Sequence, residues 1–107
     1  MNKMEKEKLY IITAYTENQV GLLSTVAGMF TRRSINIDTL RVMASTIPGV
    51  HKFTVKTRTT ESKVKSIVLN MEKKVDVIKA FYYVDNENSM HEIEEVASFL
   101  QARENNK

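Results

Sequence analysis

A short polar stretch with a glycine in it is the part of this chain whose residue types best fit small-molecule chemistry. It runs from Glu17 to Leu23 with the sequence ENQVGLL. The helix expected to follow begins with unpaired backbone N–H groups at the positive end of its dipole, and these can stabilise a carboxylate without Lys or Arg. Gly21 has no Cβ, so a ligand can approach the backbone closely. The carboxamide of Asn18 or of Asn36 can accept hydrogen bonds from an ammonium group. A free amino acid carries both charges.

An ordinary structural role competes with this hypothesis. An Asn ahead of a helix is most often a cap that accepts N–H bonds from the first turn. A Gly early in a helix is often only a turn residue. On the local pattern alone the structural role is favoured, so the ligand hypothesis depends on evidence from the longer sequence.

The elements around this stretch are predicted from hydrophobic periodicity. Strands are expected over 9–15, 35–44, 50–57 and 75–84, and helices over 21–33 and 62–73. This order is β-α-β-β-α-β, the ferredoxin-like arrangement, an α+β two-layer sandwich with a four-stranded antiparallel sheet and two helices on one face. We expect a flexible lead-in over 1–8, one domain over 9–84, and a linker with a helical tail over 85–107, the extra helix covering 90–103.

The strand predicted over 50–57 shows the clearest alternation. His51, Phe53 and Val55 are expected to point one way, and Lys52, Thr54 and Lys56 the other. This pattern predicts that helices cover one face of the sheet and leave the other face open.

Composition excludes several classes of function. The 107 residues contain no cysteine, which excludes disulfides, zinc–thiolate sites and thiol catalysis. The formal charge of +3 comes from interleaved acids and bases, so we expect no nucleic-acid partner. The first apolar segment is short and interrupted by Thr13 and Thr16, so we expect no signal peptide or membrane span and a cytoplasmic location.

Catalytic and metal-binding patterns are also missing. His51 and His91 lack the spacing typical of a metal site, and no hydrolase or P-loop motif occurs. Glu17 and Asp38 are the one pair that can be considered as acid and base, but nothing in the sequence around them supports that role. Among the aromatics that RNA-binding versions of this fold use, the third strand offers only Phe53. We therefore predict a protein with no catalytic residues and no metal.

Three segments resemble a known family, the small regulatory subunit of acetohydroxyacid synthase (acetolactate synthase). They are ENQVGLLS at 17–24, AGMFTRRSINIDTL at 27–40 and EKKVDVIK at 72–79. The family typically shows N-x-x-G-x-L, a G-L-F-x-R-R-like stretch, N-I-E-S-L and K-L-V-D-V-L-K-V, and the similarity covers about 9–84. The chain departs from the pattern at Ser34-Ile35, where the family often has Gly and an aromatic residue. It also departs in its helical tail, where many relatives continue with an apolar strand.

The resemblance implies an ACT domain that forms a homodimer and holds a regulatory amino acid at the dimer interface. The effector loop of the family corresponds to Asn18, Gln19, Val20, Gly21, Leu22 and Leu23, and its interface asparagine to Asn36. Backbone N–H groups around 20–23 are then expected to hold the carboxylate. Asn36, from the same or the partner subunit, would hold the ammonium. Leu22 and Ile37 would contact a branched side chain.

The function that the resemblance implies is regulatory. The chain would bind a branched-chain amino acid, valine, and control the catalytic subunit of acetolactate synthase in valine, leucine and isoleucine biosynthesis. The chain itself would need no cofactor, whereas the large catalytic subunit would use thiamine diphosphate, Mg and FAD. The alternative is a stand-alone ACT-type amino-acid sensor or interaction module that regulates a different enzyme.

Overall fold

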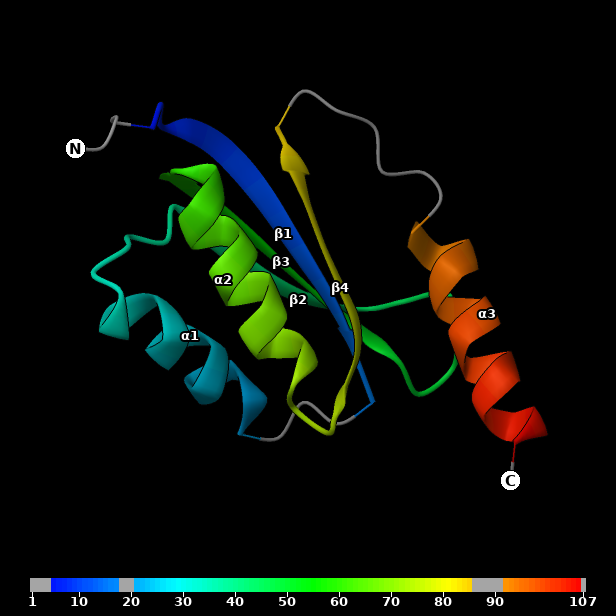
Figure 1. Cartoon of the computed structure of the whole chain (residues 1–107). Helices are drawn as coiled ribbons and strands as arrows, with labels where there is room; N and C mark the ends of the chain where they lie inside the picture. Colours follow the sequence, from blue (N-terminus) through cyan, green and yellow to red (C-terminus); the bar gives the residue numbers. More distant parts are fainter. Residues whose placement is uncertain (1–4, 18–20, 86–91, 107) are drawn as a thin grey trace.

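A four-stranded antiparallel sheet carries helices on both faces in the computed structural model, which describes residues 5–17, 21–85 and 92–106 (Figure 1). The elements are β1 (Lys8–Thr16), α1 (Leu22–Arg32), β2 (Thr39–Ala44), β3 (His51–Thr59), α2 (Glu61–Glu72), β4 (Val77–Val84) and α3 (Glu92–Asn105). The strand order is β2-β3-β1-β4, and every neighbouring pair is antiparallel. The predicted β-α-β-β-α-β order and the extra C-terminal helix are confirmed.

The end of α1 explains why β2 begins later than predicted. Ser34 has φ 54°, a left-handed conformation more usual for Gly. The Ile35 N–H donates to the Phe30 carbonyl at 3.0 Å, and the Ser34 N–H donates to the Thr31 carbonyl at 3.0 Å. These two bonds form a Schellman motif, in which buried Ile35 packs in the same cluster as Phe30. The chain therefore turns away from the helix over 34–38, and β2 starts at Thr39 rather than at residue 35.

The main core lies between the sheet and the first two helices. Ile12 and Ala14 of β1 and Phe53 and Val55 of β3 face these helices. The buried residues of α1 are Leu22, Val26, Met29 and Phe30, and those of α2 are Val64, Ile67, Val68 and Met71. Leu23, which the periodicity places on the apolar side of α1, is 47% exposed.

A second apolar cluster lies on the opposite face of the sheet, under α3. Successive strand residues point to opposite faces, so Tyr15 faces away from the side that Ala14 occupies. Tyr15, Val50 and Ile78 form this cluster with Val96 of α3, which is fully buried. Figure 1 shows α3 on the far side of β4 from α1 and α2. The prediction of an open second face is therefore wrong at this end of the sheet, because α3 covers it.

A buried carboxylate joins α3 to β1. The Tyr15 hydroxyl donates to Glu92 Oε1 at 3.1 Å, and Lys52 Nζ lies 3.9 Å from the same oxygen. Burial raises the pKa of Glu92 above its usual value, although the hydroxyls of Thr13 and Tyr15 and the charge of Lys52 offset part of this. Glu92 Oε2 is buried and has no hydrogen-bond partner among the described residues.

We expect this carboxylate to make α3 docking depend on pH. A raised folded-state pKa means that the protonated form is favoured, so this contribution to stability is lost as pH rises through the folded pKa. Glu92→Gln should therefore raise the melting temperature at pH 8 by a few degrees and flatten its change between pH 5 and pH 8. Calorimetry at both pH values checks this. Glu94→Gln, which removes a charge from another exposed position of α3, is the control. If the melting temperature of Glu92→Gln depends on pH as that of the wild type does, Glu92 is not the source of the pH dependence.

No helix within residues 5–17, 21–85 and 92–106 is long and apolar enough to cross a membrane.

Candidate functional site

The start of α1 presents backbone donors, as the sequence predicts. Gly21 is the N-cap residue with φ 77°, and no side-chain cap forms there. Its carbonyl accepts the Thr25 N–H at 3.3 Å and the Thr25 hydroxyl at 3.2 Å. The N–H groups of Leu22, Leu23 and Ser24 lie in the first turn, where a helix offers them no carbonyl. These donors and the helix dipole suit an anionic group.

A hollow of about 330 Å³ opens at this helix start. We call it the Gly21 hollow, and it is lined by Gly21, Leu22, Thr25, Lys74, Val75 and Asp76. Val75 is 91% exposed, so one wall presents an apolar side chain to solvent. Leu22 lines the hollow although most of its side chain is buried in the core. Leu23 is not among the lining residues.

Residues 74–76 are the part of this hollow that the sequence analysis missed. They form the turn between α2 and β4, more than 50 positions from Gly21. The Glu17 N–H donates to the Asp76 carbonyl at 3.0 Å, which fixes this turn beside the end of β1. The pairing of β4 with β1 could have placed these residues, because antiparallel pairing brings the start of β4 next to the end of β1.

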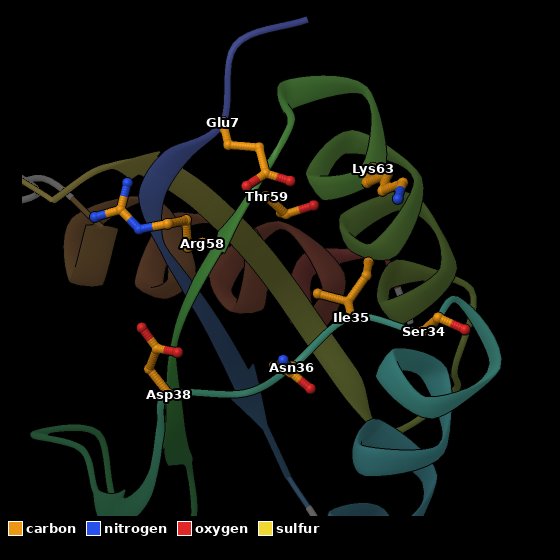
Figure 2. Close-up of a pocket in the computed structure, with 8 residues that line it drawn as sticks. All are labelled: Glu7, Ser34, Ile35, Asn36, Asp38, Arg58, Thr59 and Lys63. Atoms are coloured by element: carbon orange, nitrogen blue, oxygen red, sulfur yellow. The ribbon is translucent and has the colours of Figure 1, made fainter. Parts of the chain in front are cut away.

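Asn36 lies at a second hollow, of about 380 Å³ (Figure 2). We call it the Asn36 hollow, and it is lined by Glu7, Ser34, Ile35, Asn36, Asp38, Arg58, Thr59 and Lys63. The Asn36 backbone carbonyl accepts a hydrogen bond from the Thr57 hydroxyl at 2.7 Å, which holds the segment against β3. The Asn36 residue itself is exposed, and Ile37 packs partly buried against the core. Charged side chains of both signs surround this hollow.

One chain does not bring the predicted site residues together. Gly21 precedes α1 and Asn36 follows it, and a helix of 11 residues is about 16 Å long at its usual rise per residue. Gly21 and Leu22 share one hollow, and Asn36 lies at another. Asn18, Gln19 and Val20 fall outside the described residues.

Glu17 and Asp38, the pair considered from the sequence as acid and base, also lie at different places in the structure. Glu17 forms an ion pair with Arg103, with 2.6 Å between Oε2 and Nη2, and Asp38 lines the Asn36 hollow. Among the described residues, no group of three or more His, Asp or Glu side chains is placed to hold a metal ion.

β2 is an edge strand with apolar residues on its surface. It pairs with β3 on one side, and among the described residues no strand pairs with its other side. Val42 and Met43 are 37% and 47% exposed. An edge strand of this kind presents backbone groups and apolar side chains that can pair with another chain.

The sheet order and the placement of α1 and α2 define an ACT-like fold. The ACT domain of a GTP pyrophosphokinase from Chlorobium tepidum superposes with a TM-score of 0.60 at 15% identity, over 73% of this chain and all of that one. The acetolactate synthase small subunit from Thermotoga maritima superposes with a TM-score of 0.63 at 24% identity, over 70% of this chain and 47% of that one.

The family follows from the sequence. The model described as the AHAS small subunit-like ACT domain matches residues 12–79, which is more than half of the chain. The chain belongs to this family, and the resemblance found over 9–84 is confirmed. The probable acetolactate synthase small subunit of Methanothermobacter thermautotrophicus is 38% identical over 79 residues, covering 74% of this chain and 46% of that protein. The small subunit of acetolactate synthase isozyme 3 from Escherichia coli is 33% identical over 69 residues, covering 64% and 42%. The chain spans about half the length of these relatives.

Proposed function

We propose that this protein is a regulatory, non-catalytic partner of an acetolactate synthase catalytic subunit, and that it binds a branched-chain amino acid, valine, between two copies of itself. Membership of the family and the names of its relatives support the partner. The catalytic subunit, rather than this chain, would carry thiamine diphosphate, Mg and FAD.

The observation that carries the proposal is the position of the two hollows at opposite ends of α1. α2 packs on β4 and β1, and α1 lies beside α2 on the side away from β4 (Figure 1). If two copies pair through their β2 edges about a two-fold axis, their α1 helices run in opposite directions side by side. The start of α1 in one copy then faces the end of α1 in the other. A Gly21 hollow and the partner's Asn36 hollow can form one site in this arrangement.

The two halves of such a site suit the two charges of an amino acid. The N–H groups at the start of α1 would hold the carboxylate. The Asn36 carboxamide would accept from the ammonium, with Leu22 and Ile37 near the branched side chain. Asn18, Gln19, Val20 and Leu23 would complete the effector loop. Binding would favour one state of the assembly by a coupling of about 1–3 kcal/mol.

The experiment that tests this proposal is calorimetric titration with L-valine, D-valine and glycine. We expect L-valine to bind and to raise the melting temperature, and the other two to do so far less. Asn36→Ala should weaken L-valine binding by about 10- to 100-fold, because a hydrogen bond to a charged group contributes about 1.5–3 kcal/mol. Asn18→Ala should also weaken it.

Asn70→Ala, on α2 and not among the residues that line either hollow, is the control and should bind as the wild type does. Absence of L-valine binding to the wild-type protein would sink the proposal. Unchanged affinity in both Asn18→Ala and Asn36→Ala would refute the site.

The alternative function is an ACT-type sensor that regulates another enzyme. The position of α3 is the observation that favours this alternative. This helix lies outside the matched residues 12–79 and covers part of the second face of the sheet. Co-purification separates the two functions, since failure to bind or activate any acetolactate synthase catalytic subunit would favour the alternative.

A further inference from the structure

One end of α3 contacts Tyr15 near the end of β1, and its other end contacts Glu17, the residue after the strand. Near its start, Glu92 accepts a hydrogen bond from the Tyr15 hydroxyl at 3.1 Å. Near its end, Arg103 Nη2 lies 2.6 Å from Glu17 Oε2. Between them, Val96 is fully buried in the second apolar cluster. α3 therefore contacts Tyr15 and Glu17, which are two residues apart at the point where β1 ends.

This end of β1 is continuous with the Gly21 hollow. The Glu17 side chain pairs with Arg103, while its backbone N–H donates to the Asp76 carbonyl at 3.0 Å. Asp76 lines the hollow, and Gly21 follows Glu17 by four positions. A shift of Glu17 would therefore move one wall of the hollow.

On its β3 side this end of β1 is paired in regular register as far as Thr16, whereas its β4 side is irregular. The pairing of β1 with β4 changes register between Tyr15 and Thr16. The Thr16 hydroxyl is buried and has no hydrogen-bond partner among residues 5–17, 21–85 and 92–106. Irregular pairing of this kind is common beside functional sites, where it redirects the chain. The contacts from α3 add to the pairing with β3 in positioning this end of β1.

We propose that α3 is a regulatory strap whose docking on the sheet is coupled to amino-acid binding at the Gly21 hollow through Tyr15 and Glu17. The docked helix holds the end of β1 in the geometry that binds the effector. Because coupling between two equilibria is reciprocal, the effector also tightens the docking of α3. This inference rests on the proposed function, since it needs an amino acid at the hollow.

Charge reversal tests the contact at Glu17. Arg103→Glu and Glu17→Arg are each expected to weaken L-valine binding about 3- to 10-fold, a modest effect because both side chains are partly exposed. The double variant, which restores the pair with reversed charges, should return to within about twofold of the wild type. Gln101→Glu, which adds a negative charge at an exposed position of the same helix, is the control and should bind normally.

Displacement of the helix tests the strap as a whole. Val96→Asp buries a charge in the second cluster and should undock α3, whereas Ala97→Asp changes an exposed position next to it. We expect Val96→Asp to speed amide hydrogen exchange across α3 and to weaken L-valine binding by at least tenfold, and Ala97→Asp to do neither. In the wild type, L-valine should slow exchange in α3.

The outcomes separate this inference from the proposed function. If the wild-type protein does not bind L-valine, both are overturned. If it binds L-valine but affinity stays unchanged in Val96→Asp with α3 undocked, only the strap is overturned. Should Val96→Asp unfold the whole chain, the charge-reversal series decides, and failure of the double variant to recover binding overturns the coupling.

Discussion

Phe30→Ala is expected to lower the free energy of unfolding by about 3–5 kcal/mol, the usual cost of emptying a fully packed aromatic position. Phe30 is 1% exposed, and its carbonyl accepts the N–H groups of Arg33 and Ile35 where α1 ends. Domains of this size have a total stability of about 5–15 kcal/mol, so the variant should lose much of it. Urea denaturation followed by circular dichroism measures the loss.

Phe99→Ala supplies the matched control. Phe99 lies on α3 and is 41% exposed, so the same truncation should cost less than about 1 kcal/mol. Equal costs at the two positions would contradict the division into a buried α1 face and a partly exposed α3 face.

Val42→Asp is expected to separate the proposed dimer into monomers. Val42 is 37% exposed on the edge strand β2, and pairing of two copies there would bring two new carboxylates close together. Residues at the centre of an interface commonly contribute about 2 kcal/mol or more, which is roughly a 30-fold change in dissociation constant. Sedimentation equilibrium measures this change. Because the proposed site needs two copies, L-valine binding should weaken as the dimer dissociates.

Leu69→Asp is the comparison for this variant. Leu69 is 63% exposed on α2, away from the β2 edge, so an added carboxylate there should leave association and binding unchanged. A Val42→Asp protein that remains dimeric would show that the copies associate through another surface.

Most of the fold could be predicted from the sequence because each element carries its own periodicity. The alternation of Phe53 and Val55 and the stripe along α2 were sufficient for the strand and helix types. The start of β2 could not be predicted, because the left-handed Ser34 gives no sequence signal of the kind that Gly gives. The place of α3 could not be predicted either. The stripe of Ile93, Val96 and Leu100 indicates a buried side without indicating which surface buries it.

The candidate site was predictable only in part, because some of its residues come together only through long-range contacts. Gly21 has φ 77°, which agrees with the turn role that competes with its role in ligand binding. Lys74, Val75 and Asp76 come beside it only through long-range strand pairing, which local pattern does not reveal. The separation of Gly21 from Asn36 depends on the length and direction of α1, so it emerges only in three dimensions.

The central position of β1 has a consequence for how the protein is made. β1 is synthesised first but pairs with β3 on one side and with β4 on the other, so its second side has no neighbour until residue 84 has been added. During translation the growing chain therefore carries a strand with one unpaired side until β4 has been made, and such edges invite aggregation. Contacts between residues this distant in sequence also slow folding. Completion of the sheet must therefore wait until β4 has left the ribosome.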